Sequence, residues 1–183
     1  MKIRDAFCNY CGTKFAEPLA YPRKCTGCQM EIWANPIPVS VGLVPIRAGD
    51  RTGLLVVRRA IPPGVGKLAL PGGFLEETET WQQGCAREIR EETGVVIDAA
   101  RVEAMWFSSS QPHPNRLLLF GVAAELVAEA LPPALPNAET QERGIVFGPG
   151  GLEAEFVFSL HLAAARQYFA ARGVDRAHSF VAI

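Results

Sequence analysis

One segment constrains this chain more than any other: residues 73–95, which read GFLEETETWQQGCAREIREETGV. Within it, Glu88, Glu91 and Glu92 stand at relative positions 0, 3 and 4. At about 3.6 residues per turn, this spacing places the three carboxylates on one face of a helix. Like charges repel one another unless a cation lies among them, and Mg²⁺ and Mn²⁺ prefer oxygen ligands. The segment therefore predicts a helix that presents a divalent metal site.

Local signals mark both ends of this helix. Thr80 followed by Gln83 is a capping box, which predicts that the helix begins near Trp81. Gly94 favours the left-handed conformation that commonly follows a helix, so the helix is expected to end one residue before it. Ahead of the helix, the Pro-Gly-Gly of residues 71–73 predicts a turn where the backbone can approach a ligand closely. Small residues inside the helix would let it lie close to a sheet; they are Gly84, Cys85 and Ala86.

The segment resembles the signature box of the Nudix hydrolases. Every position that the family pattern fixes is matched, namely Gly73, Glu79, Arg87, Glu88, Ile89, Glu91, Glu92, Gly94 and Val95. A solvated acidic helix face is the alternative interpretation, but it does not explain the glycines and the arginine at these spacings. The resemblance implies an α/β/α sandwich with a mixed sheet, and hydrolysis of a nucleoside diphosphate linked to another group. Residues 73–95 are called the box below.

The resemblance also assigns roles to individual box residues. It implies that one to three Mg²⁺ or Mn²⁺ ions bind to the carboxylates, since a pyrophosphate repels attack until divalent ions neutralise its oxygens. The expected ligands are Glu88, Glu91, Glu92 and the carbonyl of Gly73. Arg87 is expected to orient the box glutamates through Glu79 or Glu91, and a simple surface ion pair is the alternative.

The general base is left open by the spacing, because in the family this role moves between the box and a later loop. Glu92 is the first candidate. Glu139 and Glu142 are the later candidates, since their segment NAETQERGIVF resembles a Glu-x-x-Glu stretch that precedes a strand in several Nudix enzymes. Exposed loop acids are the alternative interpretation. The predicted catalytic residues are Glu92, Glu91, Arg87, Glu79 and Glu142.

Four cysteines form a second metal-binding pattern near the N-terminus. They are Cys8 and Cys11, followed after thirteen residues by Cys25 and Cys28. Two such pairs close a tetrahedral shell around Zn²⁺, with Gly12 and Gly27 expected to supply the tight turns. Disulfides are the alternative, but nothing in the sequence suggests export. A closed four-sulfur shell leaves no open coordination position, so the zinc is expected to be structural.

The two patterns divide the chain into a zinc ribbon at residues 1–35 and a Nudix domain at residues 36–183. In the second domain, hydrophobic patterning predicts several strands and a closing helix. The strands are expected at 39–46, 53–58, 102–108, 117–127 and 145–147, and the helix at 156–172. These elements around the box helix suggest a mixed sheet between helices.

Composition excludes some partners and locations. Eighteen basic residues against nineteen acidic ones give no general attraction to nucleic acid or anionic membrane, so contact with nucleic acid is not expected. The longest apolar region, 117–135, is interrupted by Glu125 and Glu129, which argues against a membrane span. No signal-peptide pattern is visible, so we infer a cytoplasmic location. Since zinc ribbons often mediate dimerisation, we expect a homodimer.

Substrate class follows from a second resemblance. A zinc ribbon, then Asn35-Pro36, then a Nudix domain is similar to the NADH pyrophosphatases, which carry Ser-Gln-Pro-Trp-Pro-Phe-Pro after the box. Residues 110–116 here read SQPHPNR, so His113 and Asn115 replace the two aromatic residues. The predicted substrate-binding residues are Gln111, His113 and Arg116.

The resemblance implies cleavage of a dinucleotide such as NADH with release of AMP, and it leaves FAD and ADP-ribose open. Two other classes also stay open. A Nudix domain can sense a nucleotide without cleaving it, although such modules usually lose box glutamates. An RNA-cap hydrolase would use the basic ribbon to hold RNA.

Overall fold

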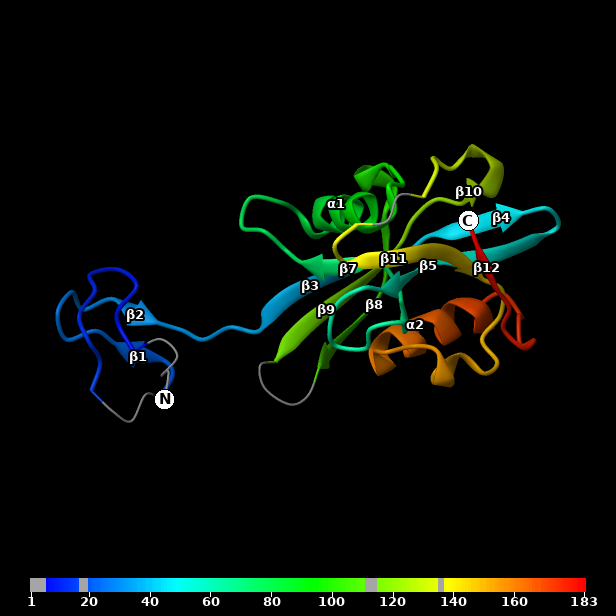
Figure 1. Ribbon diagram of the computed structural model, residues 1–183. Helices are drawn as coiled ribbons and strands as arrows, with labels where there is room; N and C mark the ends of the chain where they lie inside the picture. The colour runs from blue at the N-terminus through cyan, green and yellow to red at the C-terminus, as the bar shows by residue number, and fades with distance from the viewer. Residues whose placement is uncertain (1–5, 17–19, 111–114, 135–136) are drawn as a thin grey trace. The chain divides into compact units, whose positions relative to one another are not determined.

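The computed structural model describes residues 6–16, 20–110, 115–134 and 137–183. It divides into two compact units, Met1–Pro36 and Ile37–Ile183. The cysteine pattern lies in the first unit and the box lies in the second (Figure 1).

The first unit is a small ribbon with little regular structure. Strands β1 (Arg23–Lys24) and β2 (Glu31–Ile32) pair antiparallel, and Phe7 forms an isolated bridge with Lys14. Strands of this length bury little apolar surface, so a unit of this size needs another source of stability, such as a metal.

The second unit contains two mixed sheets. One has the order β7-β3-β9-β8, with β3 and β9 parallel and the other neighbours antiparallel. The other has the order β10-β4-β5-β11-β12 with β6 beside β5, and there β10 and β4 are parallel. The strands are β3 (Ile37–Leu43), β4 (Pro45–Ala48), β5 (Arg51–Arg59), β6 (Leu68–Ala69), β7 (Gly72–Phe74), β8 (Glu103–Ser110), β9 (Arg116–Val122), β10 (Leu126–Val127), β11 (Thr140–Val146) and β12 (Phe180–Ala182).

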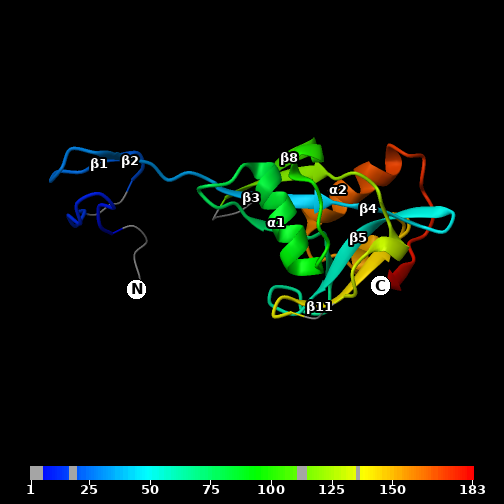
Figure 2. The same cartoon turned by 90° about the horizontal axis from the view of Figure 1, so that it is seen from above.

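Helices cover both faces of these strands. The box helix α1 (Trp81–Thr93) and the closing helix α2 (Ser159–Ala170) lie on opposite sides (Figures 1 and 2). Successive residues of β5 point to opposite faces, so Leu54 and Val56 pack in the cluster that includes α2 while Leu55 packs with α1. The predicted α/β/α sandwich with mixed pairing is confirmed, and its strands form two sheets where the sequence suggested one. Three short 3₁₀ helices complete the unit: η1 (Ala99–Arg101), η2 (Ala128–Ala130) and η3 (Leu152–Ala154).

Two predicted strands are each divided. The segment expected as one strand at 39–46 forms β3 and β4, which belong to different sheets and are separated at Val44. Pro45, the first residue of β4, has no N–H to continue a ladder, which is consistent with a break at this point. The segment expected at 117–127 likewise forms β9 and then β10.

Other element boundaries also differ from the prediction, and in β11 the cause is a run of polar residues that does not resemble a buried strand. β11 begins at Thr140, well before the predicted start at 145, so Glu142 lies inside a strand and not in a loop before it. The short strands β7 and β12 were not predicted. The closing helix α2 is shorter than the expected 156–172. Within the described part of the chain, no helix is both long enough and apolar enough to cross a membrane.

The box helix has the predicted boundaries. The Gln83 N–H donates to Thr80 Oγ1 at 3.3 Å, and the Thr80 N–H donates to Gln83 Oε1 at 2.8 Å, which completes the capping box. Gly94 follows the helix with φ of 74°. Gly42 of β3 allows the helix to approach closely, because a Cβ there would lie 2.4 Å from Ile89 Cδ1.

One of the small residues of α1, Gly84, makes a different contact from the one expected. Cys85 is buried against the sheet as predicted. Gly84, in contrast, faces the loop before the helix, because a Cβ there would meet Leu75 Cδ2 at 2.3 Å and Glu79 Oε1 at 2.7 Å. The close approach of helix to sheet therefore comes from the glycine on β3.

Candidate active site and metal sites

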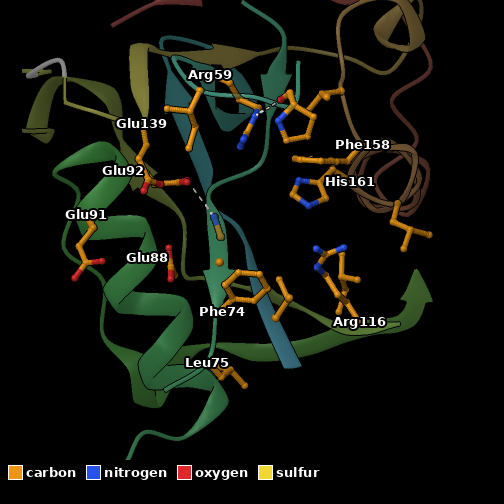
Figure 3. A pocket seen from close by; sticks show the side chains of 18 of the residues that line it. Arg59, Phe74, Leu75, Glu88, Glu91, Glu92, Arg116, Glu139, Phe158 and His161 are labelled. Atoms are coloured by element: carbon orange, nitrogen blue, oxygen red, sulfur yellow. Dashed lines mark hydrogen bonds between the residues drawn. The ribbon is translucent and has the colours of Figure 1, made fainter. Parts of the chain in front are cut away.

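A cavity of about 980 Å³ lies between α1, β7 and the start of α2. Acidic residues form one side, whereas cationic and aromatic side chains form the other (Figure 3). The acidic side consists of Glu88, Glu91, Glu92 and Glu139. The opposite side includes Arg59, Arg116, Phe158 and His161. Such a division suits a ligand that carries phosphates, with cations held between it and the acidic wall.

Arg87 is the centre of a network of ion pairs on α1. Its Nε donates to Glu79 Oε2 at 3.1 Å and its Nη2 to Glu79 Oε1 at 2.8 Å. Its Nη1 donates to Glu88 Oε1 at 2.8 Å and Glu91 Oε2 at 3.2 Å. The Arg87 guanidinium also donates to the carbonyl of Phe74 at 2.9 Å. One side chain thus joins the helix to the loop before it and to β7.

Glu92 is the most deeply buried carboxyl of the box. It is 8% exposed, and its Oε2 accepts from the Gly72 N–H at 3.1 Å. Burial raises the pKa of Glu92 to about 8, and the charges of Glu88 and Glu139 act in the same direction. Burial also raises the pKa of Glu88, with Arg87 opposing the shift. A bound dication would reverse this effect and favour both carboxylates.

The oxygen donors of the box suit a divalent metal. Their carboxylate oxygens do not cluster around one point as the cysteine sulfurs do. Gly73 lies against Glu88, because a Cβ there would stand 2.5 Å from Glu88 Oε1. Glu91 points away from Glu88 and Glu92 (Figure 3) and interacts with Arg87. Among the described residues, the cysteine quartet is the one group of potential ligands whose donor atoms already cluster. The metal-ligand assignment to Gly73 and the three glutamates therefore remains a prediction.

The two later glutamates lie in different places. Glu139 lines the main cavity beside the box. Glu142 lies elsewhere: its Oε2 accepts from Arg58 Nε at 3.0 Å, and it lines a separate hollow of about 390 Å³. A register shift between Thr140 and Glu142 accompanies this difference. The structure thus places Glu139 in the main cavity, whereas the predicted catalytic residue Glu142 lines the second hollow together with Glu92 and Thr93.

The predicted substrate-binding residues are described only in part. Gln111 and His113 lie outside the described residues. Arg116 lines the cavity, with its guanidinium carbon 5.8 Å from the centroid of the Phe74 ring. Phe74 is 52% exposed, so its ring is available to a ligand.

Sequence reasoning missed several residues of the cavity wall. Arg59 is held in place by a hydrogen bond from its Nε to the Pro63 carbonyl at 2.8 Å, and its guanidinium carbon lies 5.2 Å from the Phe158 ring centroid. Burial lowers the pKa of His161 to about 3, and the charge of Arg59 contributes, so this imidazole is neutral. Phe74 directly follows Gly73, so its place beside the box could have been predicted from the sequence. The others are distant in sequence, and only the tertiary fold brings them to the box.

The cysteine quartet forms the geometry predicted for zinc. The four sulfur atoms lie within 4.8 Å of one another, with Cys8–Cys28 at 3.7 Å and Cys11–Cys25 at 3.6 Å. All four are free thiols, so the disulfide alternative is not supported. Sulfurs at about 2.3 Å from a tetrahedral Zn²⁺ would be separated by similar distances.

Each cysteine knuckle contains a left-handed residue. In the first, Gly12 has φ of 74° and its N–H donates to the Cys8 carbonyl at 2.9 Å. In the second, the equivalent position is Gln29, with φ of 66° and a hydrogen bond to the Cys25 carbonyl at 2.9 Å. Gly27 lies in this turn as expected, but the left-handed residue is Gln29. Gly27 instead makes room for Thr13, whose Oγ1 would lie 2.3 Å from a Cβ.

Fold and site together define a Nudix domain, and the comparisons with known proteins agree. The NUDIX domain family model matches residues 36–166. The chain therefore belongs to the Nudix family, as the box predicted.

Curated relatives place this chain among known Nudix proteins. The chain is 30% identical over 116 residues to the NAD-capped RNA hydrolase NudC of Deinococcus radiodurans, covering 62% of this chain and 39% of that protein. It is 33% identical over 130 residues to NudC of Pseudomonas aeruginosa, covering 70% and 44%. This chain thus spans less than half the length of these relatives.

Two solved structures share the fold. A NUDIX hydrolase from Nitrosomonas europaea aligns with a TM-score of 0.64 and 23% identity, over 94% of this chain and 96% of that one. The NUDIX domain of Shewanella oneidensis NrtR, complexed with ADP ribose, aligns with a TM-score of 0.62 and 17% identity, over 76% and 90%. At these identities the likeness concerns the fold.

Proposed function

We propose that this protein is a metal-dependent hydrolase that cleaves the pyrophosphate of a nucleoside diphosphate derivative. The preferred substrate class is a dinucleotide such as NADH, with AMP as one product. The observation that carries this proposal is that the three helix carboxylates of the box, Glu88, Glu91 and Glu92, line a cavity that Arg59 and Arg116 also line.

In this proposal, Glu88, Glu91, Glu92 and the Gly73 carbonyl hold one or more Mg²⁺ or Mn²⁺ ions. Such ions, when bound, acidify water and neutralise phosphate oxygens. Arg87 keeps the helix and the preceding loop in register through Glu79, so that the carboxylates face the cavity. Arg59 and Arg116 bind non-bridging phosphate oxygens from the other side, because guanidinium groups pair well with such oxygens.

The proton of the attacking water goes to a carboxylate. Glu92 is our first candidate, because it is buried beside the Gly72 backbone and lines the cavity. Glu139 is the second, since it lines the same cavity. It replaces Glu142 in the proposal, because Glu142 pairs with Arg58 outside the cavity.

The substrate class draws on the similar proteins. NudC is described as an NAD-capped RNA hydrolase, and the NrtR domain was solved with ADP ribose. Both ligands contain adenosine diphosphate linked to ribose, which supports an adenine-containing pyrophosphate here. FAD and ADP-ribose stay as alternatives, and the NudC similarity favours capped RNA as a second candidate function. Retention of all box carboxylates argues against a module that only senses a nucleotide.

The zinc ribbon completes the proposal. Cys8, Cys11, Cys25 and Cys28 hold one structural Zn²⁺, supported by the spacing of their sulfurs. The proposal also includes the homodimer and the cytoplasmic location expected from the sequence.

A substrate panel tests the function. Purified protein is incubated with Mg²⁺ or Mn²⁺ and NADH, NAD⁺, FAD, ADP-ribose, diadenosine polyphosphates, dATP or NAD-capped RNA, and products are separated. We expect AMP from several adenine-containing pyrophosphates and poor cleavage of dATP. Strong activity on nucleoside triphosphates with none on dinucleotides would contradict the proposal.

A further inference from the structure

The C-terminal end of α1 is held by side chains from a distant segment. The last four carbonyls of a helix have no partner within it. Here the Arg90 carbonyl accepts from the Gly94 N–H at 2.8 Å, the usual left-handed cap. The next two carbonyls, of Glu91 and Glu92, accept from Asn137 Nδ2 at 2.9 and 3.3 Å. The residues that carry two box carboxylates are thus tied to a segment 45 residues further along the chain.

The fourth carbonyl has a side-chain partner from the same region. Arg143 Nη1 donates to the Thr93 carbonyl at 2.7 Å, and its Nη2 donates to the Pro132 carbonyl at 2.7 Å. A cation at this end also complements the helix dipole. Asn137 and Arg143 together therefore satisfy three of the four terminal carbonyls of the box helix.

The other end of the Asn137 amide organises the start of β11. Asn137 Oδ1 accepts from the Glu139 N–H at 2.9 Å and from the Thr140 N–H at 2.8 Å. This is the local side-chain turn that asparagine commonly forms. One planar amide therefore bonds the helix end with its nitrogen and the Glu139 backbone with its oxygen. Since the group is rigid, it sets the distance between these two parts of the chain.

Both parts carry carboxylates of the same cavity. Glu91 and Glu92 extend from the helix end and Glu139 from the other part, and all three line the cavity. We propose that Asn137 is a positioning residue that places Glu139 against the box carboxylates, so that all of them face one metal-bound pyrophosphate. This inference rests on the proposed function, because it concerns the same site.

The position of Asn137 separates this role from a merely structural one. The residue is exposed, so its hydrogen bonds compete with water and contribute little to global stability. A purely structural role predicts that removing the side chain slightly lowers the melting temperature and leaves kinetics unchanged. A positioning role predicts that the kinetics change while the melting temperature stays close to that of the wild type.

Two substitutions separate the two sets of hydrogen bonds that the Asn137 amide makes, one through its nitrogen to α1 and one through its oxygen to Glu139 and Thr140. Asn137→Asp keeps acceptors for the Glu139 and Thr140 N–H groups but loses the donor to α1. Asn137→Ala loses both sets of hydrogen bonds. Gln167→Ala is the control, because it removes an exposed amide from α2 away from the cavity.

We expect kcat to fall about tenfold or more in both Asn137 variants, with KM changed less than about threefold, because small misplacements of reacting groups are costly. The Mn²⁺ dissociation constant, measured by electron paramagnetic resonance, should rise about threefold or more in both, since carboxylate ligands must be held in place. Amide hydrogen exchange at Glu139 and Thr140 should accelerate in Asn137→Ala and stay slow in Asn137→Asp.

Wild-type kcat and wild-type Mn²⁺ affinity in Asn137→Asp would overturn the proposal. Equal losses in Gln167→Ala would also overturn it, because they would show no special role for this amide. If Asn137→Ala fails to fold, the kcat and Mn²⁺ affinity of Asn137→Asp alone test the positioning role. If the wild-type protein hydrolyses no pyrophosphate, the proposed function fails, while the Mn²⁺ titration still tests the positioning role.

Discussion

Arg87 binds both carboxylate oxygens of Glu79, at 3.1 Å through Nε and 2.8 Å through Nη2. This paired geometry needs the planar guanidinium, and it joins the middle of α1 to the loop that precedes the helix. The hydrogen bond from Arg87 is the main reason that the pKa of Glu79 lies below its usual value. The pair therefore acts as a fixed support on which the box carboxylates are arranged.

Replacing Arg87 with lysine should lower turnover about 10- to 100-fold, because an ammonium group cannot bind Glu79 through two parallel hydrogen bonds. Steady-state kinetics with the best substrate measures the effect. Arg90→Lys is the matched control on the same helix, where the arginine is exposed. Similar losses in both variants would indicate a general effect of altering the helix, and not a specific support.

The later glutamates make a paired test. Glu139→Gln should reduce kcat about tenfold or more, because Glu139 lines the cavity beside the box. Glu142→Gln should change kcat by less than about threefold, since its carboxylate pairs with Arg58 at a partly exposed site. The opposite order of effects would return Glu142 to the catalytic role that the sequence suggested.

Local signals were sufficient to predict the box helix, but not the strands around it. Thr80, Gln83 and Gly94 determine the ends of α1 through short-range hydrogen bonds and a left-handed φ, all of which depend on neighbouring residues. The break at Val44 is different, because an apolar run does not reveal which of two sheets its residues join. In β11, the polar run from Thr140 to Arg143 hid the first half of the strand, although Thr140 and Arg143 are buried.

The candidate site could likewise be predicted from the sequence only in part. The box residues belong to one helix and the turn before it, so their proximity follows from sequence spacing. Arg59, Phe158 and His161 reach the cavity from β5 and from the start of α2. Glu139 and Glu142 are three residues apart, but Glu139 precedes β11 and Glu142 lies within it, and they line different hollows. Only the folded chain shows which of them faces the main cavity.

The zinc proposal predicts about one tightly bound zinc per chain, held by four thiolates. Cys25→Ser should abolish this zinc and unfold the ribbon, because so small a unit has little core of its own. Cys85→Ala is the control and should retain the zinc, since Cys85 lies in α1. Atomic absorption of protein purified under reducing conditions measures the metal. Two disulfides and no zinc would contradict the assignment.

His161 gives a prediction about pH. Its pKa is lowered to about 3 in the folded protein, chiefly by burial, against an ordinary value of 6.5. The unfolded chain therefore takes up a proton at this position as pH falls below about 6.5, whereas the folded chain does not. This contribution to stability is complete above that pH and is lost progressively towards pH 3.

The check is the free energy of unfolding, measured from pH 7 to pH 4, for the wild type and His161→Leu. The loss of stability on acidification should be smaller in the variant, because it lacks the group that binds the proton on unfolding. Identical pH slopes in the two proteins would show that His161 takes up its proton equally in both states.

The most direct test of the central claim is AMP release from NADH in the presence of Mn²⁺, measured for the wild type, Glu92→Gln and Glu77→Gln. Glu92 lines the cavity, whereas Glu77 is an exposed glutamate of the box outside its fixed positions. We predict metal-dependent AMP release by the wild type and by Glu77→Gln. Glu92→Gln should be slower by about three orders of magnitude, with its fold intact, because it lacks a carboxylate needed to hold the metal and accept the proton. Near-wild-type AMP release by Glu92→Gln, or none by the wild-type protein with any adenine-containing pyrophosphate, would contradict the account.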